Sequence, residues 1–165
     1  MKNVALTLRE SGETAHLEIR GAAVGEGYFP TPDPDTLAEG RFVPADLVRR
    51  TSDGFFLAGR VSDVINIAGR KLHPAEIEAL LAKFPGVKQA VVFGIPSARR
   101  GEEPVACVAA EAHVTRDALL TFCRENLSAW QMPRDLWMVD AIPVNERGKI
   151  NRRELAARFA AEKKG

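Results

Sequence analysis

A lysine on a polar loop near the end of the chain is the residue whose type and setting are best suited to chemistry. Lys149 follows Gly148, in a loop that starts at Pro143 and precedes a segment rich in Arg, Glu and Leu. A lysine ammonium is a compact charge on a long stem, so on a loop it can meet a phosphate or carboxylate that arrives from elsewhere. Most Gly-Lys pairs are solvated turns, and this segment alone is therefore weak evidence of function.

Two longer stretches give the lysine a context. The first reads Gly59-Arg60-Val61-Ser62-Asp63-Val64-Ile65-Asn66-Ile67-Ala68-Gly69-Arg70-Lys71 and continues with Pro74-Ala75-Glu76-Ile77-Glu78. The second contains the lysine and reads Pro143-Val144-Asn145-Glu146-Arg147-Gly148-Lys149-Ile150-Asn151-Arg152-Arg153-Glu154-Leu155. Both contain glycines and cations, and a cation beside a glycine turn can meet an anionic ligand.

Composition excludes several functional classes. The 165 residues carry a net charge of +1, so nothing in them predicts a nucleic-acid partner or a membrane surface. His16, His73 and His113 show no metal-ligand spacing, and no metal site is expected. Cys107 and Cys123 lie in apolar segments, where buried free thiols are typical. No run approaches the roughly 20 apolar residues of a membrane span, and the N-terminus lacks the core of a signal peptide, which favours a cytoplasmic protein.

The elements before residue 60 are predicted to be short antiparallel strands. Apolar and polar residues alternate within residues 4–29, around a hairpin turn at 11–14. Glycines and prolines make residues 21–45 rich in loops, and Asp53-Gly54 indicates a second hairpin. This portion is too small to own a full hydrophobic core.

After residue 60 the pattern is typical of a compact α+β domain. Pro74 starts a helix that carries acidic residues in its early turns, and Thr115 is expected to cap the N-terminus of another. The predicted order is β-α-β-β-α-β-α, and residues 69–71 are expected to form a turn. The order is counted from residue 64. Strands are expected within the apolar segment 61–67 and at 87–95, 104–110 and 137–139. Helices are expected from 74 to a stop at 84–87, at 115–126 and at 152–163.

The stretch from Gly59 to Glu78 closely resembles the hinge motif of the adenylate-forming enzymes. That superfamily contains acyl- and aryl-CoA synthetases, adenylation domains of non-ribosomal peptide synthetases, and luciferases. The stretch around Lys149 is similar to the superfamily's C-terminal catalytic-lysine motif, at the interval expected for its small C-terminal lid domain. Residues 84–87 and 91–96 resemble the run hPGV…AAVVGVPD between them. The resemblance covers the whole chain, most strongly from residue 40 onward.

The resemblance implies a role for each residue that matches the adenylation step. Lys149 takes the place of the lysine that bridges the substrate carboxylate and the α-phosphate of ATP, where a cation offsets charge that opposes attack. Asp46 matches the aspartate that accepts hydrogen bonds from the ribose hydroxyls. Arg60 matches an arginine that contacts the same nucleotide. Lys71 matches a basic residue near the phosphates.

The thiol step and the hinge are matched by a second group of residues. Gly69 and Arg70 resemble the turn that lines the tunnel for the incoming thiol. Arg124 stands where some members bind the nucleotide phosphate of CoA. Ser62 takes the hinge position, which is usually aspartate or lysine, and a serine can still rotate through the required change in φ and ψ. Two further departures are Pro44-Ala45-Asp46-Leu47 in place of T-G-D-L and Trp130-Gln131-Met132-Pro133 in place of Y-K-x-P.

Each assignment has a structural alternative. Asp46 could cap a turn, and Arg60 could belong to a surface ion pair that contributes little to stability. Residues 69–71 could be a basic turn without a ligand. For Arg124, on a predicted helix face, a solvated role is favoured over CoA binding. Trp130 and Trp137 are expected to be core or interface aromatics.

The chain lacks the superfamily's Ser/Thr/Gly-rich phosphate loop and its aromatic-x-x-Thr-Glu motif. These belong to the large N-terminal domain, which supplies the ATP bed, the Mg²⁺ ligand and the acyl pocket. We therefore expect residues 1–60 to be the β-rich last part of that domain and residues 61–165 to be the lid, with the hinge near 60–63. The chain would be an excised piece or a split or truncated gene product, and it is expected to be inactive alone.

The function implied is the C-terminal portion of an ATP-dependent acyl- or aryl-CoA ligase. A carboxylic acid attacks Mg-ATP to give an acyl-adenylate and pyrophosphate; the lid then turns about Ser62, and CoA displaces AMP. An alternative is a non-catalytic module that binds a carrier protein or a separate N-terminal partner. A ligase that uses a carrier protein as acceptor is a third interpretation, and Arg124 with the turn at 69–71 favours CoA over it. The acyl substrate is not indicated, because its pocket lies in the large domain.

Overall fold

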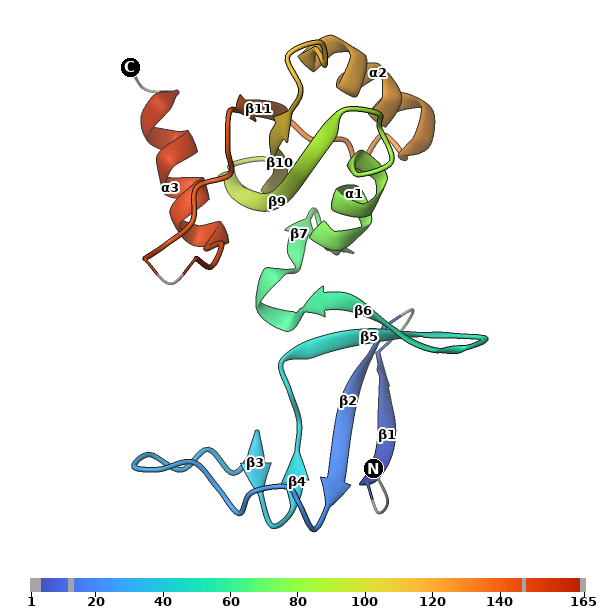
Figure 1. Ribbon diagram of the computed structural model, residues 1–165, viewed down its shortest axis with the longest axis vertical. Helices are drawn as coiled ribbons and strands as arrows, with labels where there is room; N and C mark the ends of the chain where they lie inside the picture. Colours follow the sequence, from blue (N-terminus) through green and yellow to red (C-terminus); the bar gives the residue numbers. More distant parts are fainter. Residues whose placement is uncertain (1–3, 12–13, 147, 164–165) are drawn as a thin grey trace. The chain divides into compact units, whose positions relative to one another are not determined.

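The chain forms two compact units in the computed structural model, which describes residues 4–11, 14–146 and 148–163 (Figure 1). The first unit is Met1–Ser62 and the second is Asp63–Gly165. Each unit has its own β-sheet, and the three α-helices all belong to the second unit. The α+β class predicted from the sequence is confirmed.

Antiparallel strands make up the sheet of the first unit. Its strands are β1 (Val4–Ser11), β2 (Thr14–Gly21), β3 (Leu37–Ala38), β4 (Arg41–Phe42), β5 (Asp46–Thr51) and β6 (Gly54–Arg60). Their order is β3-β4-β2-β5-β6, and β1 also pairs with β2. The hairpin predicted at Asp53-Gly54 joins β5 to β6. The hairpin predicted at 11–14 joins β1 to β2, but its turn residues 12 and 13 lie outside the described residues.

The first unit buries few apolar side chains. Among its described residues only Ala15, Leu47, Val48 and Ala58 are buried hydrophobics. Seven large apolar residues of β1, β6 and the loop between β2 and β3 are exposed, namely Val4, Leu6, Tyr28, Phe29, Phe55, Phe56 and Leu57. The prediction that this portion is too small to own a full core agrees with this distribution.

The second unit is a sheet covered by helices on both faces. Its elements are β7 (Ile65–Ile67), β8 (Arg70–Leu72), α1 (Pro74–Leu81), β9 (Val87–Ser97), β10 (Gly101–Ala110), α2 (Arg116–Asn126), β11 (Asp135–Val139) and α3 (Arg152–Glu162). The sheet order is β11-β10-β7-β8, with β9 on β10; β10 and β11 run parallel and the other pairs are antiparallel.

Alternation along β9 and β10 divides the core of this unit in two. One cluster gathers Val92, Ala106 and Val108 with side chains of α1 and α2. The other gathers Val91 and Phe93 with Leu155 and Phe159 of α3. Successive strand residues point to opposite faces, so α1 and α2 cover one face of the sheet and α3 covers the other (Figure 1).

The turn predicted at 69–71 is wrong in its extent. The chain reverses at Ala68 and Gly69, with φ of 50° and 84°, and Arg70 and Lys71 already belong to β8. Two successive residues with positive φ make a tight two-residue hairpin turn, which leaves room for the extra strand. The order therefore begins β-β-α instead of β-α. Residues Val61–Asp63, at the start of the apolar segment 61–67, form a 3₁₀ helix.

Candidate functional site

The loop that carries Lys149 is organised by Asn145. The Asn145 N–H donates to the Lys149 carbonyl at 2.9 Å, and the Gly148 N–H donates to the Asn145 carbonyl at 2.9 Å. The Lys149 N–H donates to Asn145 Oδ1 at 2.9 Å. Gly148 has φ of 69°, a conformation that glycine adopts without steric cost. These bonds fix the backbone of the turn and leave the Lys149 side chain exposed.

Helix α3 begins directly after this loop. Asn151 is its N-cap, and its Oδ1 accepts hydrogen bonds from the N–H groups of Arg153 at 3.1 Å and Glu154 at 3.3 Å. Ile150 packs against the core cluster that also contains Leu155. The residues on the C-terminal side of Lys149 are thus held by a helix cap and by core packing.

Arg152, the first residue of α3, lies in a network that the sequence did not reveal. Its Nη1 donates to Asp63 Oδ2 at 2.8 Å, its Nη2 donates to Glu78 Oε1 at 2.8 Å, and its Nε donates to the Val92 carbonyl at 3.0 Å. Glu78 Oε1 also accepts the Val92 N–H at 2.8 Å. All but Val92 belong to the two stretches that suggested function. Opposite charge in the two stretches was the available signal, but it does not say which charges meet.

The hairpin of β7 and β8 carries the residues matched to the thiol tunnel. The Gly69 N–H donates to Asn66 Oδ1 at 3.0 Å, and the Asn66 N–H donates to Glu102 Oε2 at 2.7 Å. The Ala68 N–H donates to the Arg100 carbonyl at 2.7 Å. A Cβ added at Gly69 would meet no atom within 4 Å. Hydrogen bonds from neighbouring residues therefore hold the backbone of the turn, and the space on the side where a Gly69 side chain would project is open.

The side chains of Arg70 and Lys71, both on β8 of this hairpin, have different surroundings. The Arg70 guanidinium lies over the Trp130 ring, 5.3 Å from its centroid, in a cation–π contact. Lys71 is exposed, as is Arg124 in the last turn of α2. Within the described residues, no hydrogen bond, ion pair or ring contact joins Arg124 to the hairpin.

Asp46 and Arg60 lie together in the first unit. They are cross-strand partners in β5 and β6, and Arg60 Nε donates to Asp46 Oδ1 at 3.1 Å. The side chains are 38% and 66% exposed, so both can still be reached by a ligand. Arg60 therefore does take part in a surface ion pair, and its partner is the other residue matched to the nucleotide. The exposed Ser62 follows two residues later, at the end of the first unit.

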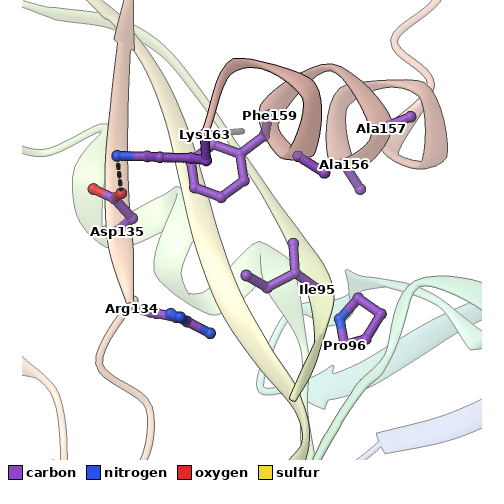
Figure 2. A pocket seen from close by; sticks show the side chains of 9 residues that line it. Ile95, Pro96, Arg134, Asp135, Ala156, Ala157, Phe159 and Lys163 are labelled. Carbon is purple, nitrogen blue, oxygen red and sulfur yellow. Dashed lines mark ion pairs between the residues drawn. The ribbon is translucent and has the colours of Figure 1, made fainter. Parts of the chain in front are cut away.

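A separate pocket of about 550 Å³ lies between α3 and the sheet (Figure 2). Apolar side chains such as Ile95, Pro96 and Phe159 line it, and an ion pair of 2.8 Å between Lys163 and Asp135 lies at its edge. Burial raises the pKa of Asp135, but hydrogen bonds from Lys163 and Arg116 outweigh it and hold the pKa below its usual value. None of the residues proposed for catalysis or binding lines this pocket.

Three further expectations concern the whole chain. Cys107 and Cys123 are buried and free, as predicted, and burial raises the pKa of the Cys107 thiol to about 11. Over residues 4–11, 14–146 and 148–163, no three His, Cys, Asp or Glu side chains gather in a way that suits a metal ion. The helices in the described part of the chain are too short or too polar to span a bilayer.

Comparison with known proteins places these residues in context. Residues 76–149 match the family described as AMP-binding enzyme C-terminal domain. A probable CoA ligase of Humulus lupulus is 36% identical over 157 residues, which are 92% of this chain and 29% of that protein. An oxalate–CoA ligase of Arabidopsis thaliana is 33% identical over 92% of this chain and 30% of its own length. The chain thus spans about 30% of the curated relatives that it matches.

Solved structures of adenylate-forming enzymes have a similar fold. The o-succinylbenzoate CoA synthetase of Bacillus subtilis, in complex with its acyl-adenylate intermediate, superposes with a TM-score of 0.82 at 25% identity. That match covers 94% of this chain and 34% of the synthetase. ATP-bound MatB of Rhodopseudomonas palustris has a TM-score of 0.84 at 25% identity, over 96% of this chain and 34% of its own.

Proposed function

This chain belongs to the adenylate-forming superfamily through its AMP-binding enzyme C-terminal domain, and we propose that it provides the lid and the adenylation lysine of an AMP-forming acyl- or aryl-CoA ligase. In this proposal residues 61–165 are the lid, and residues 1–60 are the last β-rich part of the large domain. The large domain would supply the ATP bed, the acyl pocket and the Mg²⁺ ligands. We place the enzyme in the cytoplasm.

The observation that carries the proposal is the state of Lys149. Its backbone makes two hydrogen bonds with Asn145, and Gly148 makes a third, while the exposed Lys149 ammonium has no hydrogen bond or ion pair among the described residues. Because the ammonium has no protein partner to leave, it can reach an anionic ligand from a fixed turn without breaking an ion pair. In the proposed first step the ammonium bridges the substrate carboxylate and the α-phosphate, and it offsets the negative charge that opposes their approach.

Asp46 and Arg60 would hold the nucleotide in that step. The Asp46 carboxylate is able to accept both ribose hydroxyls, and Arg60 can leave an exposed ion pair at small cost to contact the phosphate or ribose. Lys71 is exposed and unpaired within the described residues, so it is available to a phosphate from the lid side.

The second step would use the β7–β8 hairpin. After adenylation the lid turns about Ser62, which withdraws Lys149 and presents the turn at Gly69 to the acyl-adenylate. The open outer side of Gly69 leaves room for a narrow thiol chain, and the Trp130 ring holds the Arg70 guanidinium in place beside it. The CoA thiol attacks the acyl carbonyl and AMP leaves. Arg124 is assigned to the nucleotide phosphate of CoA.

The test is Lys149→Ala in the complete gene product, together with any separate large-domain polypeptide that it needs. Pyrophosphate release from acid and ATP is measured separately from thioester formation with preformed adenylate. We expect the first rate to fall by about 10²- to 10³-fold, as for loss of one charge-stabilising group, and the second to stay within a few fold. Lys83→Ala, at an exposed lysine after α1, is the matched control. Equal loss of both rates would contradict the proposal.

A second candidate function is a binding module without its own chemistry. The exposed apolar side chains of the first unit favour it, because such a surface is typical of one that another polypeptide covers. Calorimetric titration of the 165-residue chain with CoA, with a carrier protein and with a large-domain polypeptide separates the possibilities. Binding to CoA supports the ligase, and binding to a carrier protein alone supports the module. Binding to the large-domain polypeptide is expected of both, and thioester formation by that complex would then support the ligase. Absence of binding to all three contradicts the module.

A further inference from the structure

We propose that Arg152 is a positioning residue that links the Lys149 loop to the segment directly after the hinge. The lysine then keeps its position relative to the rest of the lid when the lid rotates. The inference rests on the proposed function, in which Lys149 serves adenylation and Ser62 is the hinge. It adds a role for three side chains, those of Arg152, Asp63 and Glu78.

Arg152 uses all three of its guanidinium nitrogens on partners that are far apart in the sequence. Nε meets the Val92 carbonyl in β9 at 3.0 Å, Nη1 meets Asp63 at 2.8 Å, and Nη2 meets Glu78 in α1 at 2.8 Å. The guanidinium is planar and its five donors form a rigid fork. Three simultaneous partners therefore fix both the position and the direction of the side chain.

The network is more sheltered than a surface ion pair. The Arg152 side chain is 31% exposed, and those of Asp63 and Glu78 are 21% and 20% exposed. Charge-assisted hydrogen bonds in such a setting are shorter and stronger than neutral ones. Removal of the guanidinium would leave two carboxylates facing the same vacated space, and their repulsion would separate the segments that carry them.

The network joins the residue next to the hinge to the helix next to the Lys149 loop. Asp63 is the residue after Ser62, and Arg152 begins the helix whose cap, Asn151, is two residues after Lys149. A rotation at the hinge is thus transmitted from Asp63 to Arg152 through one ion pair, and from Arg152 to Lys149 through the two residues between them, Ile150 and the N-cap Asn151. Without Arg152 the same rotation would reach the lysine only through the packing of α3 on the sheet.

A first experiment measures the coupling in the 165-residue chain. Amide hydrogen exchange is followed for Asn145, Gly148 and Lys149, the three donors of the loop. With Arg152→Gln we expect these amides to exchange about tenfold faster or more, the effect of losing charge-assisted hydrogen bonds, while amides of β10 change less. Arg153→Gln, at the exposed neighbour, should leave the loop amides unchanged. A uniform increase over all amides would mean a general loss of stability and would overturn the proposal.

A second experiment measures the two half-reactions in the complete gene product. Asp63→Asn keeps the shape of the side chain but removes the charge, so it weakens the ion pair with Arg152 next to the hinge. We expect Asp63→Asn and Arg152→Gln to lower kcat for adenylation about tenfold, with KM for ATP and thioester formation from preformed adenylate within about threefold. Arg152→Lys should recover part of kcat, because one of the three contacts can be kept.

The outcomes separate this inference from the proposed function. If Lys149→Ala spares adenylation, the function assigned to the lysine is wrong. If Lys149→Ala abolishes adenylation but Asp63→Asn leaves it unchanged, only the positioning role is wrong. Equal losses in both half-reactions for Asp63→Asn would also overturn the positioning role. Should Arg152→Gln fail to fold, Asp63→Asn still decides the question.

Discussion

Asp46 and Arg60 are hydrogen-bonded to each other across the open end of the β5–β6 hairpin, with 3.1 Å between Asp46 Oδ1 and Arg60 Nε. Both residues resemble nucleotide-contacting residues of the superfamily, and in the structure each is the other's partner. Exposed ion pairs contribute only about 0.2–1 kcal/mol to stability. The pair therefore orients two side chains on a rigid hairpin and can be opened by a ligand at small cost.

The first prediction concerns this pair. Asp46→Ala removes the acceptor for the ribose hydroxyls, so we expect KM for ATP in the complete gene product to rise about tenfold or more. The free energy of unfolding should fall by less than about 1 kcal/mol, because the pair is exposed. Steady-state kinetics and denaturant titration measure the two effects. Arg49→Gln, which removes an exposed arginine of the same hairpin lying over Phe56, should change neither KM nor kcat. A large loss of stability with an unchanged KM would refute the assignment.

A second prediction concerns Gly148, whose φ of 69° is needed for the turn that presents Lys149. A β-branched residue is strained in this conformation, whereas asparagine tolerates it. A Cβ at this position would meet no atom within 4 Å, so the effect of a substitution is that of backbone strain alone. We expect Gly148→Val to lower the adenylation rate by about tenfold and Gly148→Asn to stay within about threefold, since about 1–2 kcal/mol of strain separates them. Similar rates for the two variants would show that the turn does not position the lysine.

Local signals predicted much of the second unit. Pro74 starts α1 at its first turn, and Thr115 Oγ1 caps α2 by accepting the Ala118 N–H at 3.2 Å. Such signals act within three or four residues, so they can be found in the sequence. Strand β8 was missed because Ala68 has a positive φ, which alanine rarely adopts. Only the surrounding contacts, such as the bond from the Ala68 N–H to the Arg100 carbonyl, support that conformation.

For the candidate site, the sequence predicted which residues matter but not their contacts. The two motifs identified Lys149 and Arg60 as residues of interest, and the resemblance of residues 44–47 to T-G-D-L identified Asp46, but a motif does not show which residues are in contact. The network of Arg152 joins residues that are 89, 74 and 60 positions away in the chain. Contacts over such separations depend on how α3 packs on the sheet, and no local pattern encodes them. The same reason explains why the contact between Arg70 and Trp130 was not expected.

A third prediction follows from the uneven distribution of the core. Both buried clusters belong to residues 65–159, and the first unit has only four buried hydrophobic side chains among its described residues. We expect residues 63–165 alone to unfold cooperatively on heating, and residues 1–62 alone to show no cooperative transition. Circular dichroism and calorimetry of the two pieces measure this. In the whole chain, limited proteolysis should cut first within residues 1–62. Cooperative unfolding of the isolated first unit would contradict the prediction.

The fourth prediction concerns alkaline pH. Burial, with a smaller contribution from Glu162, raises the pKa of Cys107 from 9.0 to about 11 in the folded chain. Below about pH 9 the thiol is protonated in both states, and its contribution to stability is fully present. Between pH 9 and 11 the unfolded chain gives up this proton while the folded chain keeps it, so the free energy of unfolding falls as pH rises. A shift of this size corresponds to a loss of about 2–3 kcal/mol by pH 11.

Denaturant titrations at pH 8, 9, 10 and 11 measure this loss. Cys107→Ala is the matched variant, because it has no thiol to titrate. Its stability should be lower at pH 8, since the side chain fills the core beneath α3, but it should decline less between pH 9 and 11 than that of the unsubstituted chain. All other titratable groups are present in both proteins, so the difference between the two slopes reports on Cys107. Equal slopes would show that the thiol does not keep its proton when the chain is folded.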